Sequence, residues 1–236
     1  MGTILVKEKS VVVPGEELAE GMDYLPAQGT YRQGDFIRAA KLGLVNVDGK
    51  VIKLIPLSGR YLPKKGDTII GQVIDISFSG WRLDINSAYS AMLSLKDATS
   101  EFIIRGADLT QYYNLGDYLV AKITNVTSQK LVDLSMKGPG LRSVRGGRIV
   151  KVNTNKVPRV IGKQGSMVVT VKNATDTKII VGQNGLVWVM GENPKMEALA
   201  VNTIKKIEAE AHMPGLTERI KNYLEEEVRK LKGESQ

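Results

Sequence analysis

Apolar residues near the start of the chain come in short runs separated by glycine, proline or Asp-Gly pairs. Examples within residues 1–62 are VVV, GLVNV and VIKLIPL. Short apolar runs bounded by turn-forming residues are typical of β-strands. The segment Val47-Asp48-Gly49-Lys50-Val51 predicts a hairpin, because Asp-Gly fits the tight turns that join antiparallel strands. Residues 1–62 are therefore expected to form a small N-terminal β domain.

A second series of strands is expected between residues 63 and 138. The runs TIIGQVIDIS, WRLDIN, YSAMLSL, NLGDYLVAKITNV and LVDLSMK indicate strands, with a longer polar link after the third. Gly66-Asp67 and Gly116-Asp117 each stand just before one of these strands. Five strands in this arrangement predict a Greek-key barrel of the OB type.

Residues 139–236 show both the strand and the helix periodicity. A strand, a glycine turn and a helix are followed by two strands and a long helix. Apolar residues at helical spacing form two stripes, which are interpreted as core or docking faces: Met196, Leu199, Ala200, Ile204 and Ile207, then Leu216, Ile220, Tyr223, Leu224, Val228 and Leu231. The expected fold class is mixed β and α+β: the small β domain, the five-stranded barrel, and an α+β domain with terminal helices.

The placement of charge adds a functional indication. The chain has 236 residues with 33 Lys plus Arg and 25 Asp plus Glu, a net charge of +8. No acidic residue occurs from Leu134 to Thr175. The basic residues of that stretch are Lys137, Arg142, Arg145, Arg148, Lys151, Lys156, Arg159, Lys163 and Lys172. Scattered lysines usually mark a solvated face, but a block with one sign of charge beside a glycine-rich turn favours a polyanion partner.

Residues suited to catalysis or metal binding are scarce. There is no Cys, and the single His is His212. One His without Cys cannot form a His/Cys metal cluster, and no paired-carboxylate, nucleophile-elbow or Walker pattern occurs. The sequence therefore predicts a protein that is not an enzyme, with no cofactor and no metal. The lack of Cys and of an N-terminal signal-peptide pattern favours a cytoplasmic location.

The stretch VPRVIGKQGSMVV contains a glycine turn with a candidate anion contact. Gly162 and Gly165 flank Lys163 and Gln164, and Arg159 precedes them. Without Cβ atoms, the turn lets backbone amides approach a phosphate, and the cations add sequence-independent attraction. Taken alone, the pattern fits a tight helix–helix turn about as well as an RNA contact.

Residues 139–236 contain further basic residues, a second glycine pair and a tryptophan that need an interpretation. Arg145 and Arg148 join the candidate contacts to a polyanion, because they belong to the acid-free block. The second glycine pair, Gly182-Gln183-Asn184-Gly185, is interpreted as a structural turn in which Asn184 or Gly185 has a positive φ. Trp188 is expected in the core rather than as a stacking platform.

The order of these segments carries a family resemblance. The run from KKGDTIIGQVIDIS to LVDLSMK resembles the S1 RNA-binding domain. The following unit, with IGKQGS and the later Gly182-Gln183-Asn184-Gly185, resembles a KH domain of the exosome type. An early VVVPGEEL, then S1, then such a KH domain is the order of the RNA-binding cap subunit of the archaeal RNA exosome. The resemblance divides the chain into residues 1–62, 63–138 and 139–236.

The resemblance implies a function. Cap subunits of that family are non-catalytic, and three copies, alone or mixed with another cap subunit, sit on a hexameric phosphorolytic ring. The N-terminal domain docks on the ring, and the S1 domains line the entry pore. The cap recruits single-stranded RNA, with a reported preference for poly(A), and guides its 3′ end inward. A free-standing S1/KH module acting in translation or RNA stability is the alternative, and a nuclease is a distant third.

The same resemblance locates the expected RNA face of the barrel. Aligned on Gly80, the ligand-face positions of the S1 family fall on Ser79, Arg82 and Ser94, whereas alignment on aromatic residues gives Phe78 and Trp81. Strand alternation decides for the first alignment. Trp81, Leu83 and Ile85 share one face, which is expected to be the interior.

That choice leaves the barrel without its usual stacking rings. The expected contacts are then phosphate contacts made by Arg82, with help from Arg105 and Lys122. Such contacts suit a guide for any single strand better than a reader of sequence.

Overall fold

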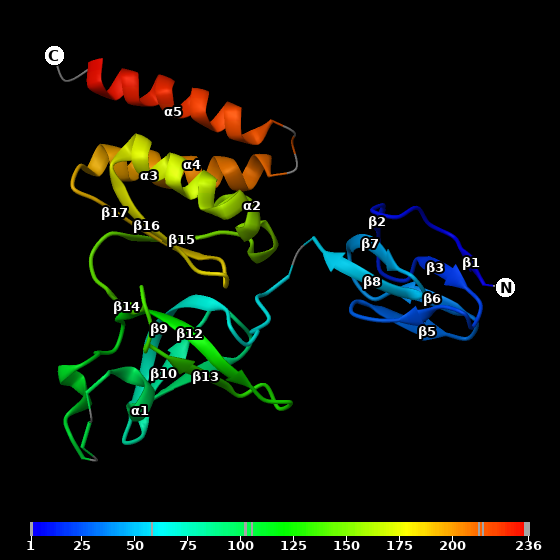
Figure 1. The fold of residues 1–236 in the computed structure, drawn as a ribbon, viewed down its shortest axis with the longest axis horizontal. Helices are drawn as coiled ribbons and strands as arrows, with labels where there is room; N and C mark the ends of the chain where they lie inside the picture. The colour runs from blue at the N-terminus through cyan, green and yellow to red at the C-terminus, as the bar shows by residue number, and fades with distance from the viewer. Residues whose placement is uncertain are drawn as a thin grey trace. The chain divides into compact units, whose positions relative to one another are not determined.

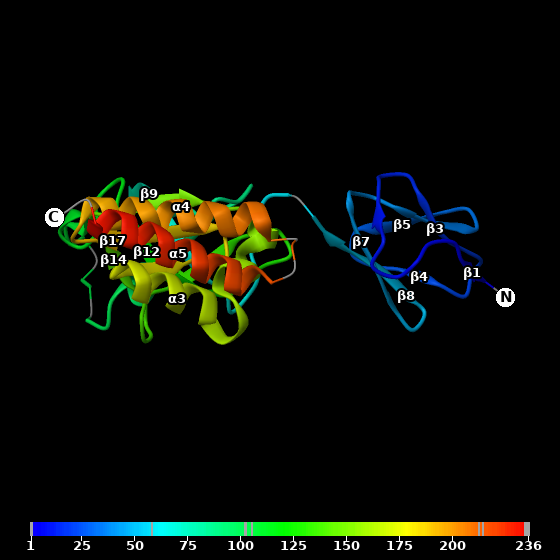
Figure 2. The ribbon, with the colours of Figure 1, turned by 90° about the horizontal axis from the view of Figure 1, so that it is seen from above.

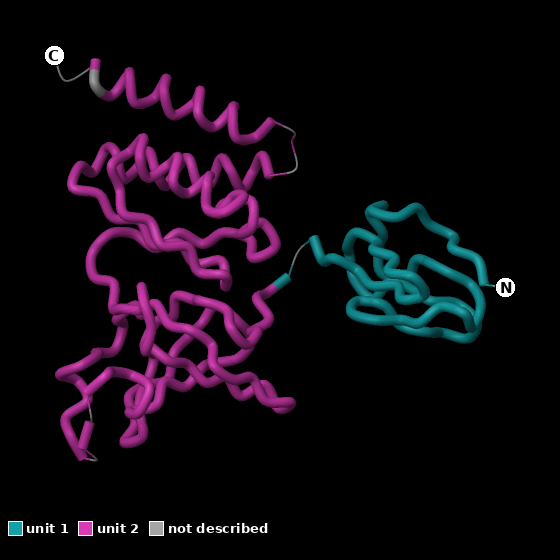
Figure 3. The backbone as a smooth tube through the Cα atoms, in the orientation of Figure 1, with its two compact units in different colours: residues 1–59 teal, residues 60–236 magenta. Residues whose placement is uncertain are grey.

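The computed structural model describes residues 2–57, 59–101, 103–104, 106–211, 213 and 215–233. The chain divides into two compact units, Met1–Gly59 and Arg60–Gln236 (Figure 3). Across the described ranges, no helix is both long enough and apolar enough to span a lipid bilayer.

The first unit consists of two small sheets of four strands each in its described part. One has the order β1-β3-β6-β5 and the other the order β2-β7-β8-β4 (Figure 1). The strands are β1 (Thr3–Ile4), β2 (Val11–Val12), β3 (Glu17–Glu20), β4 (Leu25–Pro26), β5 (Thr30–Gln33), β6 (Phe36–Ala39), β7 (Gly43–Asp48) and β8 (Val51–Pro56). The β7–β8 hairpin predicted from Asp48-Gly49 is confirmed, with Asp48 opposite Val51. Leu18, Ile37 and Ile52 are fully buried in the core of this unit.

The second unit begins with the predicted barrel, which is confirmed. Its strands are β9 (Thr68–Ser77), β10 (Gly80–Asp84), β11 (Ser90–Ser94), β12 (Tyr118–Val126) and β13 (Val132–Ser135). They follow the order β13-β11-β10-β9-β12, and pairing of β12 with β13 closes the barrel. The long link after the third strand contains α1 (Leu95–Ala98) and a 3-10 turn, Leu109–Gln111. Trp81, Leu83 and Ile85 are fully buried, as strand alternation predicted.

Tyr61, near the start of the second unit, is part of the barrel core. Its ring is buried in the barrel core, and its hydroxyl donates a hydrogen bond of 2.6 Å to Asp67 Oδ2. Burial and this hydrogen bond raise the pKa of Tyr61 far above its usual value. Its carbonyl accepts a hydrogen bond from the Ser87 hydroxyl. The barrel therefore includes residues that precede position 63.

A sixth strand, β14 (Arg142–Val144), pairs with β12 and leads into an α+β layer. The sheet of this layer has the order β15-β17-β16, all antiparallel. Its strands are β15 (Arg148–Lys151), β16 (Thr177–Val181) and β17 (Leu186–Gly191). Together with the helices that cover this sheet, these strands confirm the expected order of strand, turn, helix, two strands and long helix.

Helices cover one face of this sheet and the barrel covers the other (Figure 1). The helices are α2 (Val157–Ile161), α3 (Ser166–Thr175), α4 (Pro194–Glu210) and α5 (Leu216–Gly233), with 3-10 turns at Thr154–Lys156 and Lys163–Gly165. The two predicted apolar stripes lie on α4 and α5. Ile204, Ile207 and Ile220 are buried in the common core of the layer. Helix α5 lies alongside α4 and contacts α3 as well (Figure 2).

Candidate nucleic-acid interface

The first glycine turn joins α2 to α3, and the space around its two glycines differs. Gly162 has φ 77° and ψ 174°, a conformation that only glycine adopts readily. A Cβ there would lie 2.6 Å from the backbone nitrogen of Met167, so this glycine serves the fold. Gly165 has φ 82°, but a Cβ there would meet nothing within 4 Å. Lys163 and Gln164, between them, are exposed. The Gly165 side of the turn is therefore the side that a ligand can approach.

The second glycine turn, between β16 and β17, joins the α+β layer to the barrel. Asn184 is fully buried, and its side chain forms three hydrogen bonds across the junction. Oδ1 accepts from Ile70 N at 3.3 Å, while Nδ2 donates to Ile70 O at 2.7 Å and to Ile85 O at 2.9 Å. The amide of the neighbouring Gln183 donates to Thr68 O at 2.9 Å. This turn also shapes a hairpin, in which Gly185 has φ 81°.

The glycines of the second turn let the chains approach closely. A Cβ on Gly182 would clash with Asn184 Oδ1 and lie 2.9 Å from Ile70 N. A Cβ on Gly185 would clash with Val152 O. Beside the turn, Ile70 of the barrel packs with Leu186 and Trp188 in one apolar cluster. Trp188 is 4% exposed and donates from Nε1 to Gly146 O, which confirms that it is a core residue.

On the outer face of the barrel, Arg82 is exposed but is not free. Its Nη2 lies 2.6 Å from Asp75 Oδ2, so its charge is neutralised by a neighbour on β9. Lys122 is exposed on β12, where it stands opposite Thr68. Asp75 and Thr68 lie near opposite ends of β9, roughly 20 Å apart at the usual rise per residue. The structure therefore does not bring Arg82 and Lys122 into one site.

The barrel exposes one of the two aromatic residues that the alternative alignment selected, whereas the other, Trp81, is buried. Phe78 lies in the turn between β9 and β10 and is 91% exposed. It borders a cleft of about 690 Å³ whose other lining residues are Ser79, Ser94, Leu95, Lys96, Ser100, Glu101, Ile103, Gly106 and Lys137. Alignment on aromatic residues selected Phe78, but strand alternation gave no information on it, because the ring lies in the turn.

The remaining candidates are spread over the second unit. Ser94 ends β11 and its hydroxyl bonds to Asp97 Oδ2 at 2.8 Å. Arg148 pairs with Glu197 at 2.8 Å. Arg145 lies in a loop that borders a cleft of about 500 Å³ together with Asp117. Arg159 is exposed on α2, one turn before the first glycine turn. Arg105 and His212 lie outside the described residues.

Comparison with known proteins agrees with this architecture. The chain matches family models for the RRP4 S1 domain at residues 60–105 and for a KH domain at residues 147–195. It also matches the model for the N-terminal region of the exosome complex exonuclease RRP4 at residues 11–48. An S1 barrel joined to a KH domain places the chain in a class built from two kinds of RNA-binding module.

Full-length relatives narrow the class to one family. The exosome complex component Rrp4 of Pyrococcus furiosus is 43% identical over 98% of this chain and 89% of the relative. The Rrp4 of Methanobrevibacter smithii is 45% identical over 94% of this chain and 72% of the relative. The chain belongs to the Rrp4 family.

A solved structure supports the same assignment. A crystal structure named as an exosome complex RNA-binding protein superimposes with a TM-score of 0.66 at 37% identity. The match covers 72% of this chain and 98% of that chain.

Proposed function

We propose that this protein is a non-catalytic, RNA-binding cap subunit of an exosome, which recruits single-stranded RNA and guides its 3′ end into a phosphorolytic ring. The observation that carries the proposal is the sequence similarity to exosome Rrp4 components, which extends over nearly the whole chain. The fold supports it, since an S1 barrel and a KH domain are both surfaces for single-stranded nucleic acid.

The first unit is proposed to dock on the ring. It has its own core, and it exposes several large apolar side chains that its own sheets leave uncovered. These are Val11, Val13, Met22, Leu25 and Ile55, each more than half exposed. These side chains are the proposed contacts with the ring. Three copies on a hexameric ring, alone or mixed with another cap subunit, remain the arrangement expected from the family resemblance.

The second unit is proposed to hold the RNA. The open side of the first glycine turn, with Lys163 and Arg159, supplies phosphate contacts. Phe78 adds a ring on which a base can stack. The combination fits a strand that is gripped mainly through its backbone, with a base contact as the source of any preference for poly(A). The cytoplasmic location stays a prediction from composition.

Size-exclusion chromatography with a phosphorolytic exosome ring tests the proposal. The full chain should co-elute with the ring, and residues 60–236 should not, while still binding RNA. The truncation begins at residue 60 because Tyr61 belongs to the barrel core. If the full chain binds RNA but never the ring, the free-standing RNA-binding module replaces the cap subunit. RNA decay by the pure chain would contradict the non-catalytic assignment.

A further inference from the structure

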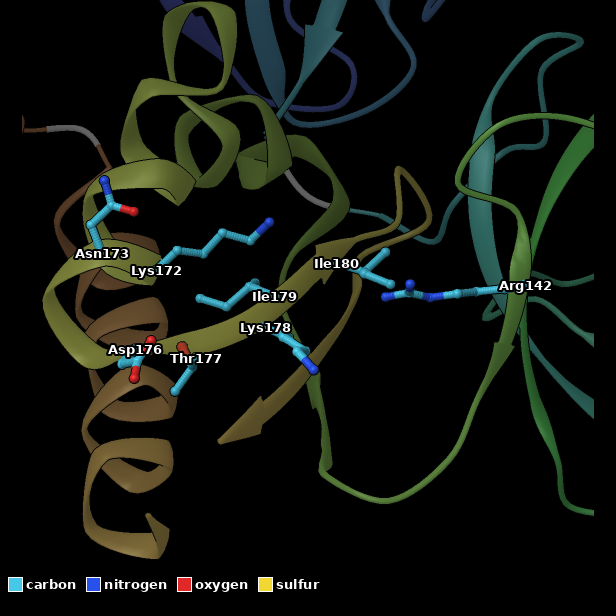
Figure 4. A pocket seen from close by; sticks show the side chains of 8 residues that line it. All are labelled: Arg142, Lys172, Asn173, Asp176, Thr177, Lys178, Ile179 and Ile180. Atoms are coloured by element: carbon cyan, nitrogen blue, oxygen red, sulfur yellow. The ribbon is translucent and has the colours of Figure 1, made fainter. Parts of the chain in front are cut away.

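Three basic side chains from three different elements line one cleft at the junction of the barrel and the α+β layer (Figure 4). Arg142 comes from β14, Lys172 from α3 and Lys178 from β16. The cleft has a volume of about 520 Å³. Its other lining residues are Asn173, Asp176, Thr177, Ile179 and Ile180.

Among the described residues, these cations differ from Arg82 and Arg148 in having no carboxylate as an ion-pair partner. Arg82 and Arg148 each form an ion pair with a carboxylate. Within the described part of the chain, Arg142, Lys172 and Lys178 form no ion pair. Asp176 is the one carboxylate among the described lining residues, so the cleft carries three positive charges against one negative charge. Like charges held together by low-dielectric walls repel one another and attract an anion.

Packing at the junction brings together the strands that carry Arg142 and Lys178. Pairing of β14 with β12 sets Arg142 opposite Val120 of the barrel. The preceding residue, Leu141, packs in the same interface cluster as Ile180 of β16. In Figure 4 the Arg142 side chain extends from its strand toward Ile180, and Lys172 extends from α3 over β16. The site is therefore assembled only when the two domains are docked.

The open edge of β16 adds donors to the cleft. In the described sheet, β16 is one of the two outer strands and pairs only with β17. Backbone N–H groups on an unpaired strand edge are available to an oxygen ligand. A phosphate accepts hydrogen bonds from such amides and from a guanidinium at the same time.

We propose that this cleft binds a backbone phosphate of the RNA strand that also contacts the first glycine turn. Lys163 and Lys172 lie near opposite ends of α3, a helix of 10 residues and therefore about 15 Å long. A strand that follows α3 passes from the glycine turn to Arg142. The inference rests on the proposed RNA-binding function, and it adds that one RNA strand contacts both domains at their junction.

Single substitutions in the full chain test the inference, with a short single-stranded RNA and a salt titration. Arg142→Ala and Lys178→Ala should each weaken RNA binding about fivefold at low salt and reduce the log–log salt slope by about 0.7. Lys205→Ala, which removes an exposed charge from α4, should change neither value. Asp176→Asn should tighten binding about twofold, because it removes repulsion and because Asn also tolerates the φ of 49° at this position.

The outcomes separate this inference from the proposed function. If the wild-type chain does not bind RNA, both are wrong. If the wild-type chain binds RNA and Arg142→Ala behaves like Lys205→Ala, only the cleft is wrong. Titration with inorganic phosphate tests whether the cleft binds free phosphate instead of RNA. Phosphate binding that is lost in Arg142→Ala, with RNA affinity unchanged, would assign the cleft to free phosphate and overturn the RNA contact.

Discussion

Two turns of the α+β layer share the spacing Gly-x-x-Gly and have opposite surroundings. In the first, residues 162–165, the middle residues Lys163 and Gln164 are exposed. In the second, residues 182–185, Asn184 is fully buried and hydrogen-bonded to the barrel. The comparison teaches that glycine spacing indicates close approach, but that the approaching group is identified only by the neighbours. For the second turn it is the protein itself, and for the first we propose RNA.

Asn184→Ala is expected to have the largest effect. It leaves the amide of Ile70 and the carbonyls of Ile70 and Ile85 without this partner, each at a cost of about 1 kcal/mol or more. Thermal unfolding should show a loss of about 3 kcal/mol, or a Tm lower by roughly 5–10 °C. The control is Gln183→Ala, which should cost less than about 1 kcal/mol, because the main-chain bond to Thr68 remains. Equal melting of the two variants would remove the distinction between the turns.

Gly162→Ala is expected to have the next largest effect. It tests whether one glycine of the first turn, Gly162, is needed for folding. The new methyl group would press against the Met167 backbone, in a conformation that strains any other residue. We expect a loss of about 2–3 kcal/mol in denaturant unfolding, with RNA binding retained under conditions where the protein is folded. Gly165→Ala, with no atom nearby, should cost only about 1 kcal/mol. A reversal of this order would mean that the turn rearranges.

Phe78→Ala sharpens the comparison by separating base contact from phosphate contact. Stacking of one base on an aromatic ring is worth about 1–3 kcal/mol, so RNA affinity should fall roughly tenfold. Phe78→Tyr should retain the affinity. An RNA with abasic positions should bind the wild type and Phe78→Ala equally well. Stability should not change, since the ring is 91% exposed. An undiminished affinity of Phe78→Ala for normal RNA would exclude a stacking role.

Gly165→Asp tests the open half of the first turn. It places a carboxylate where a phosphate is proposed to lie, so RNA binding should weaken about fivefold at low salt. Gly165→Asn is the matched control, because Asn has nearly the same shape and tolerates the positive φ. Circular dichroism of the two variants should agree. If Asp and Asn bind RNA alike, charge at this position is irrelevant and the turn is not a phosphate contact.

Lys163→Ala is expected to have the smallest effect. One exposed phosphate contact should contribute about twofold to threefold in affinity and about 0.7 to the log–log salt slope. The loss should be the same for poly(A) and poly(U), since a phosphate contact carries no base information. Fluorescence anisotropy at two or three salt concentrations is sufficient. A loss confined to one of the two RNAs would indicate a base contact instead.

Much of the fold could be predicted from the sequence because its signals are local. Alternation placed Trp81 in the barrel interior, and Asp48-Gly49 predicted a hairpin that the structure contains. The two apolar stripes near the C-terminus predicted α4 and α5. Each of these patterns depends on neighbours within a few residues.

The candidate site could be predicted less well from the sequence, because its geometry depends on contacts between residues far apart in the chain. Asn184 bonds to Ile70, which is 114 residues away along the chain. Alternation indicated that Arg82 points outward, but it did not indicate that Asp75 of the neighbouring strand β9 forms an ion pair with it. Phe78 lies in a turn, where strand alternation no longer applies. The cations of the junction cleft meet only after the barrel and the α+β layer have packed together.

The shared apolar cluster of the barrel and the α+β layer has a consequence for synthesis on the ribosome. Ile70, Val120 and Val144 of the cluster emerge before Leu186 and Trp188, which cover them. Translation at about 5–20 residues per second separates Val144 from Trp188 by a few seconds. During that interval the nascent barrel carries an uncovered apolar patch. A ribosome stalled between the two points would therefore present a chain with exposed apolar surface that is prone to aggregate.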